Sequence, residues 1–220
     1  PITAVAERLA LHPQSPYLLV DAAQSFGQIP VQKAAAAADI YAFTGHKWAC
    51  GPEGLGGVAL SERVLAEGQP TVIGWRSLRD ESKADLSSSD PFHHDSRRFE
   101  VATSCVPLMA GLRCSLDLLD QEGSAQARGV QIRQLSGVLW SGLRELAGVN
   151  PLMDVPPSSG LVSFQLCRER DCSNVVKQLG NQGIWIRDLA DPECLRACTH
   201  VSTRNNEIVG LLSALDEILN

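Results

Sequence analysis

Apolar residues in the first part of the chain follow two different spacings. Ile2, Val5 and Leu9 repeat with the period of one buried helix face, and Pro13 ends that pattern. Short continuous apolar runs come next, as is typical of buried strands. The predicted elements are a strand at 18–20, an alanine-rich helix within 29–39, strands at 40–43 and 58–60, and a short helix at 61–67. Two strands joined by a helix-length connection predict a parallel βαβ unit and an α/β fold.

Two long amphipathic helices are predicted in the middle of the chain. The first begins after Ser104, Gly123 interrupts the pattern, and the second ends near Gly148. Their apolar stripes are Leu108, Leu112, Leu116 and Leu119 in the first helix and Ile132, Leu135, Leu139, Leu143 and Leu146 in the second. We expect both stripes to be core rather than part of a ligand site.

The last part of the chain predicts a second, smaller α/β domain. A proline- and serine-rich turn at 150–160 precedes a strand at 161–166, a helix at 172–179, strands at 184–186 and 195–201, and a closing helix from about Asn205. The predicted organisation is therefore a larger domain at 1–103, connecting helices at 104–149 and a small domain at 150–220.

The segment 68–96 is the least regular part of the chain. A loop of this length inside a compact domain is usually functional or mobile. Trp75 and Arg76 are its bulky members. Two interpretations stay open: a tryptophan packed over the loop beside a solvated arginine, or an arginine that attracts a substrate carboxylate.

Charge and hydropathy exclude several classes of partner. The net charge is −6 and no basic run occurs, which argues against nucleic acid or an anionic membrane as the main partner. Asp21 interrupts the apolar run at 18–20, so no stretch reaches the length that a bilayer needs. The first residues lack the pattern of a secretory signal, and we expect a cytoplasmic location.

The seven cysteines are an odd number and form no C-x-x-C pair. In a cytoplasmic chain they are expected to remain reduced thiols. Cys194 with Cys198, and His93 with His94, are the only pairs that invite a metal, and neither has a second pair beside it. We expect no metal site.

A group of polar residues follows two of the predicted strands. Asp21 ends the first strand and Gln24 lies three places on, whereas Thr44, His46 and Lys47 follow the second strand and precede a glycine-rich loop. Parallel strands would place these side chains on one rim of a sheet, where they suit an aromatic cofactor with a phosphate tail. Taken singly, they also fit a turn aspartate, a structural histidine and a solvated lysine.

These residues resemble the class V aminotransferase family, the pyridoxal-phosphate (PLP) enzymes that include cysteine desulfurases. The shared motifs are D-x-A-Q, [ST]-x-H-K and G-P-x-G-x-G. The chain is similar, more closely, to cyanobacterial cystine C-S lyases, through AFTGHKW, IGWRS and RFEVATS. The resemblance implies a fold-type I PLP transferase, with part of a mainly parallel large-domain sheet and a smaller C-terminal domain.

The resemblance also implies roles for five residues. Lys47 would bind the cofactor aldehyde covalently and carry the substrate's α-proton. Asp21 would keep the pyridine nitrogen protonated, Gln24 would hydrogen-bond the ring hydroxyl, and Thr44 and His46 would contact the phosphate.

Further roles concern the partner subunit and the substrate. Thr103 matches the family's R-F-E-x-G-T threonine, with Ala102 in place of glycine, and implies a homodimer in which it reaches the other protomer's phosphate. Arg196 matches the family arginine that binds the substrate α-carboxylate. Arg187 could hold the far carboxylate of cystine, and surface ion pairs are the alternative for both arginines.

The reaction expected is β-elimination from cystine or cysteine, giving pyruvate, ammonia and a persulfide or sulfide that could feed iron-sulfur cluster assembly. A desulfurase needs a nucleophilic thiol on a loop before the carboxylate arginine, and residues 184–194 contain no such motif. A cysteine desulfurase and an epimerase- or kynureninase-like enzyme remain alternatives. Because the resemblance covers little more than the C-terminal half of family members, a missing N-terminal half as partner, or a non-catalytic interaction module, also remains open.

Overall fold

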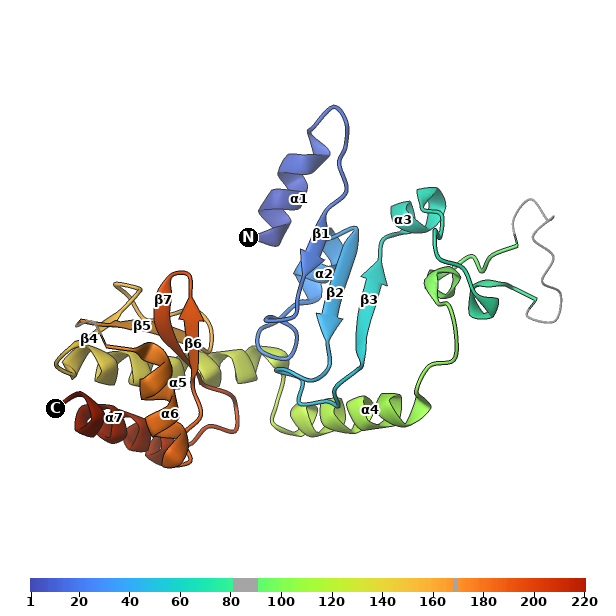
Figure 1. Cartoon of the computed structure of the whole chain (residues 1–220). Helices are drawn as coiled ribbons and strands as arrows, with labels where there is room; N and C mark the ends of the chain where they lie inside the picture. Colours follow the sequence, from blue (N-terminus) through green and yellow to red (C-terminus); the bar gives the residue numbers. More distant parts are fainter. Residues whose placement is uncertain (81–90, 168–169) are drawn as a thin grey trace. The chain divides into compact units, whose positions relative to one another are not determined.

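The computed structural model describes residues 1–80, 91–167 and 170–220 (Figure 1). The chain divides into two compact units, Pro1–Leu119 and Asp120–Asn220. Residues 81–90 of the irregular segment 68–96 lie outside the described residues.

The first unit contains a three-stranded sheet with the order β1-β2-β3 (Figure 1). Its elements are α1 (Ile2–Ala10), β1 (Leu19–Asp21), α2 (Gln32–Ala37), β2 (Ile40–Thr44), β3 (Gly56–Leu60), α3 (Glu62–Glu67), the 3-10 turns η1 (Trp75–Ser77) and η2 (Ser96–Phe99), and α4 (Val106–Gln121). β1 and β2 are parallel, as predicted, whereas β3 is antiparallel to β2. The sheet in the described residues is therefore mixed rather than mainly parallel.

The core of this sheet is small. Val20, Ala22, Ala38 and Tyr41 are buried together, whereas Leu19 is 63% exposed. β1 and β3 each pair only with β2 among the described strands, so both are edge strands there. Strand edges and exposed apolar residues of this kind are usually covered in a folded protein.

The second unit contains a four-stranded sheet with the order β4-β5-β7-β6 (Figure 1). Its elements are α5 (Ala125–Glu145), β4 (Val149–Pro151), β5 (Leu161–Leu166), α6 (Cys172–Asn181), β6 (Arg187–Ala190), β7 (Glu193–Cys198) and α7 (Asn205–Leu219). Phe164, Leu195 and Leu215 are fully buried between the sheet and the helices. Side-chain caps begin two of these helices, because Ser124 accepts from Ala127 N and Asp171 from Ser173 N.

Two strand predictions in the second unit were wrong in position, and one strand, β4, was not predicted. The strand expected at 184–186 lies at Arg187–Ala190, because Ile184 N donates to Leu179 O and so closes the end of α6. β7 ends at Cys198 rather than at the predicted residue 201, because residues 199–200 belong to no strand and residues 201–202 form a turn. β4 falls partly in the expected turn, where an edge strand accommodates Pro151.

Candidate functional site

The parallel pairing of β1 with β2 brings the first group of candidate residues to one rim. Asp21 is the last residue of β1 and lies opposite Ala42, two residues before β2 ends at Thr44. Asp21 is exposed and its Oδ1 accepts from Ala23 N at 2.9 Å, as a turn aspartate does. Its second oxygen has no partner among the described residues. The carboxylate therefore supports the local turn and still presents an acceptor to a ligand.

The loop after β2 carries His46 and Lys47 outward. Gly45 N donates to Leu55 O and Gly51 N donates to Gly45 O, both at 2.8 Å, which closes the loop at its base. A Cβ on Gly51 would lie 2.7 Å from Leu112 Cδ1 of α4 and 3.0 Å from Gly45 O, so a larger residue there would require the Leu112 side chain to move. His46 and Lys47 are exposed, and neither side chain has a hydrogen bond or ion pair within the described residues. Both side chains are consequently available to an anionic ligand.

Thr44 carries an orphaned polar atom at the base of this loop. Its Oγ1 is buried and has no hydrogen-bond partner in the described part of the chain. A buried hydroxyl without a partner is costly unless a ligand completes it. A phosphate oxygen would do so, and the fit of the residues to a phosphate-bearing cofactor rests on this observation together with the exposed His46 and Lys47 that follow in the chain.

Gln24 is held by a residue that the sequence had not singled out. Trp48 Nε1 donates to Gln24 Oε1 at 2.9 Å, and Gln28 Nε2 donates to the Gln24 backbone carbonyl at 3.0 Å. Trp48 is only 7% exposed, whereas Gln24 is exposed. The one feature of the sequence that could have indicated this role for Trp48 is its position directly after Lys47.

The two motifs IGWRS and RFEVATS come together in space. Ser77 Oγ donates to Glu100 O at 2.5 Å, and Gly74 packs so closely on Val101 that an added Cβ would lie 1.8 Å from its carbonyl oxygen. Trp75 is 44% exposed, and the Arg76 guanidinium lies 5.3 Å from its ring centre. Trp75 and Arg76 are thereby held beside the segment that leads to Thr103.

Thr103 and Arg76, which belong to these two motifs, can still contact a ligand. Thr103 is exposed, and the buried Nε of Arg76 has no partner among the described atoms. No hydrogen bond or ion pair within the described residues joins Arg76 or Thr103 to Asp21 or Lys47. The structure therefore gathers two separate groups of candidate residues within the first unit.

The two candidate arginines of the second unit are cross-strand neighbours. Arg187 of β6 is opposite Arg196 of β7, and Ser163 of β5 is opposite Arg196 on its other side. Leu195 and Ala197 of β7 lie in the core, so strand alternation puts Arg196 on the other face. The Nε of Arg196 is buried without a partner. Like charges opposite each other destabilise a sheet, and an anion between them would remove that cost.

The cysteine thiols near these groups are held in the neutral form. Burial raises the pKa of the Cys194 and Cys198 thiols, an effect that the nearby Arg196 only partly offsets. Burial also raises the pKa of Cys50, three residues after Lys47. Since the thiolate is the nucleophile, these cysteines are poorly reactive at neutral pH.

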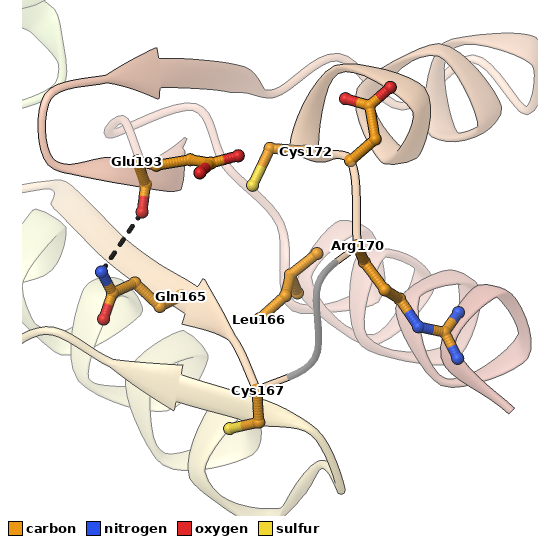
Figure 2. Close-up of a pocket in the computed structure, with 7 residues that line it drawn as sticks. Gln165, Leu166, Cys167, Arg170, Cys172 and Glu193 are labelled. Carbon is orange, nitrogen blue, oxygen red and sulfur yellow. Dashed lines mark hydrogen bonds between the residues drawn. The ribbon is translucent and has the colours of Figure 1, made fainter.

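A hollow of about 720 Å³ lies between the end of β5 and the start of α6 (Figure 2). Its lining includes Cys167, Cys172 and Glu193. Gln165 Nε2 donates to Glu193 O at 3.3 Å, and the Arg170 guanidinium donates to the carbonyls of Ile218 and Leu219. These polar groups are engaged in joining the strands and α7, so they stabilise the unit rather than form a reactive cluster.

Two kinds of feature are absent from the described residues. Nowhere in 1–80, 91–167 or 170–220 do three or more histidine, cysteine or acidic side chains gather as metal ligands would. None of the described helices combines the length and the apolar character that crossing a bilayer requires.

The first unit thus places an exposed lysine after two parallel strands, and the sheet of the second unit carries a cross-strand pair of arginines. Residues 2–206 match the family described as Aminotransferase class-V, and the chain belongs to that family. A cysteine desulfurase from Haloferax volcanii is 28% identical over 233 residues, which cover 98% of this chain and 51% of the relative.

Two solved structures match at higher identity. A complex between the cystine C-S lyase C-DES and its reaction product cysteine persulfide is 38% identical, with a TM-score of 0.90, and covers 99% of this chain and 57% of that one. A C-DES mutant with glycine covalently linked to the PLP cofactor is 37% identical, with the same TM-score, and the match covers 99% and 56% of the two chains. These matches confirm the predicted fold class and family. The chain spans about half the length of the curated relatives it matches.

Proposed function

We propose that this chain is the C-terminal part of a PLP-dependent carbon-sulfur lyase that cleaves cystine or cysteine by β-elimination. The family and the two C-DES structures support the class of reaction. The proposal extends to a cytoplasmic enzyme that acts on a small amino acid and could supply sulfur for iron-sulfur clusters.

The observation that carries the choice of lyase over desulfurase is the β6–β7 hairpin. β6 ends at Ala190 and β7 begins at Glu193, so Asp191 and Pro192 alone connect them. Cys194 follows inside β7 with no exposed surface, and burial raises its pKa. A desulfurase thiol must travel to its substrate, and a buried thiol in a paired strand is in the wrong place and protonation state for that task.

The residues proposed for the cofactor are Lys47, Asp21, Gln24, Thr44 and His46. Lys47 would hold the aldehyde and move the α-proton, Asp21 would face the pyridine nitrogen, and Thr44 with His46 would bind phosphate. When bound, PLP supplies the electron sink for the pair released at the α-carbon. The exposed amine of Lys47 and the orphaned Thr44 hydroxyl fit such a ligand.

The residues proposed for the substrate are Arg196 for the α-carboxylate and Arg187 for the far carboxylate of cystine. A planar guanidinium fork matches a carboxylate in two hydrogen bonds. Trp75 and Arg76 are also proposed to bind substrate, and Thr103 to reach the phosphate of the other subunit in a homodimer. The contacts of Ser77 with Glu100 and of Gly74 with Val101, which hold the two segments together, support a common role. The half that the relatives possess and this chain does not match would complete the large domain.

The proposed reaction balances without an oxidant. The α-proton leaves to Lys47, the Cβ–S bond breaks, and the sulfur departs with the electron pair as cysteine persulfide. Addition of one water to the remaining three-carbon fragment gives pyruvate and ammonia. The test is to produce the protein at its full natural length and supply cystine. Pyruvate is expected, whereas alanine with a persulfide on the enzyme would establish a desulfurase instead.

A different class of function, a non-catalytic interaction module, is tested by cofactor binding. We expect the full-length protein to bind PLP with a visible absorbance band, and Lys47→Ala to lose the covalent link. A protein that binds no PLP would favour the module.

A further inference from the structure

We infer that Trp48 is a positioning residue that makes Gln24 a hydrogen-bond donor toward the ligand. The inference rests on the proposed function, because the ligand concerned is the ring oxygen of PLP. It concerns the orientation of the Gln24 amide, which the resemblance to the family does not address.

The orientation follows from the chemistry of the two side chains. An indole N–H only donates, so its partner at 2.9 Å must be the oxygen of the Gln24 amide rather than the nitrogen. Gln24 is then left with its NH₂ group for any further contact. Without the indole, either end of the amide could turn toward the ligand, since the two ends have nearly the same shape.

The indole is a rigid anchor. Trp48 is 7% exposed and Ala49 beside it is fully buried. A Cβ on Gly27 would lie 2.5 Å from the Trp48 carbonyl carbon, so the turn after β1 packs directly on the Trp48 backbone. The backbone carbonyl of Gln24 is held as well, by the buried Gln28. Both ends of the Gln24 residue are therefore restrained before a ligand arrives.

A fixed donor acts on the protonation state of the oxygen that it meets. Hydrogen bonds to an ionised oxygen are stronger than those to a neutral one, so the donor favours the ionised form and lowers its pKa. Trp48 also directly follows Lys47. One loop thus carries the amine and sets the polarity of the ring-oxygen contact.

The first experiment needs no cofactor. The indole N–H resonance of Trp48 is recorded by NMR in the wild-type chain and in Gln24→Met, with Trp185→Phe as the control because Trp185 is 80% exposed in the second unit. We expect the Trp48 indole signal to shift and its exchange with water to quicken in Gln24→Met. An unchanged signal would overturn the inference, whatever the function of the protein.

The second experiment uses the PLP-loaded full-length protein. The pH midpoint of its visible band is measured for Trp48→Phe, Gln24→Ala and the double variant. We expect Trp48→Phe and Gln24→Ala each to raise the midpoint by about one pH unit, and the double variant to show no further rise, because both remove one contact. Independent, additive shifts, or a Trp48→Phe midpoint equal to that of the wild type, would refute the positioning role. If the wild type shows no PLP band, the proposed function fails instead, and the indole measurement still decides the contact.

Discussion

Arg187 and Arg196 lie directly opposite one another on β6 and β7, and the Nε of Arg196 is buried without a partner among the described residues. Two guanidinium groups in this register repel each other unless an anion lies between them. The arrangement is therefore unfavourable in the empty protein and favourable for a carboxylate.

Replacing Arg187 with alanine is expected to leave stability unchanged or slightly higher, because it removes the like-charge pair. The same change should raise KM for cystine about tenfold or more while affecting cysteine less, since only cystine has a far carboxylate. Lys177→Ala on the exposed surface of α6 is the control. Equal effects on both substrates would contradict the assignment of Arg187 to the far carboxylate.

Thr44→Val should have opposite effects on stability and on cofactor binding. Valine keeps the shape of the side chain and removes a buried hydroxyl that has no partner in the described residues. We expect the cofactor-free protein to gain up to about 1 kcal/mol in unfolding free energy, and PLP affinity to fall. Denaturant unfolding and cofactor titration measure the two effects.

Thr199→Val is the matched control for that prediction. Thr199 is also buried, but its Oγ1 donates to Ile132 O at 3.3 Å. Its replacement should destabilise the protein by about 1 kcal/mol. A loss of stability in both variants would show that the Thr44 hydroxyl has a partner.

The reactivity of Cys194 distinguishes a carbon-sulfur lyase from a cysteine desulfurase. Because burial raises its pKa and leaves it no exposed surface, we expect iodoacetamide to leave Cys194 unlabelled at neutral pH while the exposed Cys105, Cys114 and Cys167 react. Mass spectrometry of peptides gives the order of labelling. Cys194→Ala should retain pyruvate formation from cystine, and loss of turnover in a folded variant would favour a desulfurase.

The pair Asp95 and Arg97 gives a pH-dependent prediction. Hydrogen bonds from the Arg97 side chain and backbone lower the pKa of Asp95 to about 2. A carboxylate with a depressed native pKa stabilises the fold above its unfolded pKa, and that contribution disappears as the pH falls toward about 2. NMR titration of the Asp95 carboxyl should show this midpoint, and Arg97→Gln should raise it toward the ordinary range. An unaltered midpoint in Arg97→Gln would rule out the pair as its cause.

Much of the first unit could be predicted because its signals are local. Apolar runs ending in Asp21 and Thr44 mark β1 and β2, and Ser61 begins α3 where its hydroxyl accepts from Val64 N. In the second unit, Ile184, Trp185 and Ile186 look like a strand, yet Ile184 completes the end of α6. Apolar character alone does not distinguish a helix end from a strand, because both bury the same side chains. The domain boundaries and the roles of the site residues stay predictions.

The order of residues along the chain by itself determined the family motifs and the α/β class, since motif spacing and hydrophobic period are properties of neighbouring residues. Only the tertiary structure decided that Trp48 reaches Gln24 and that Arg187 is opposite Arg196. These pairs depend on how the turn after β1 packs on the lysine loop and on the register of β6 with β7. A shift of one residue in that register would turn Arg187 to the other face, so strand pairing, not sequence distance, sets the contact.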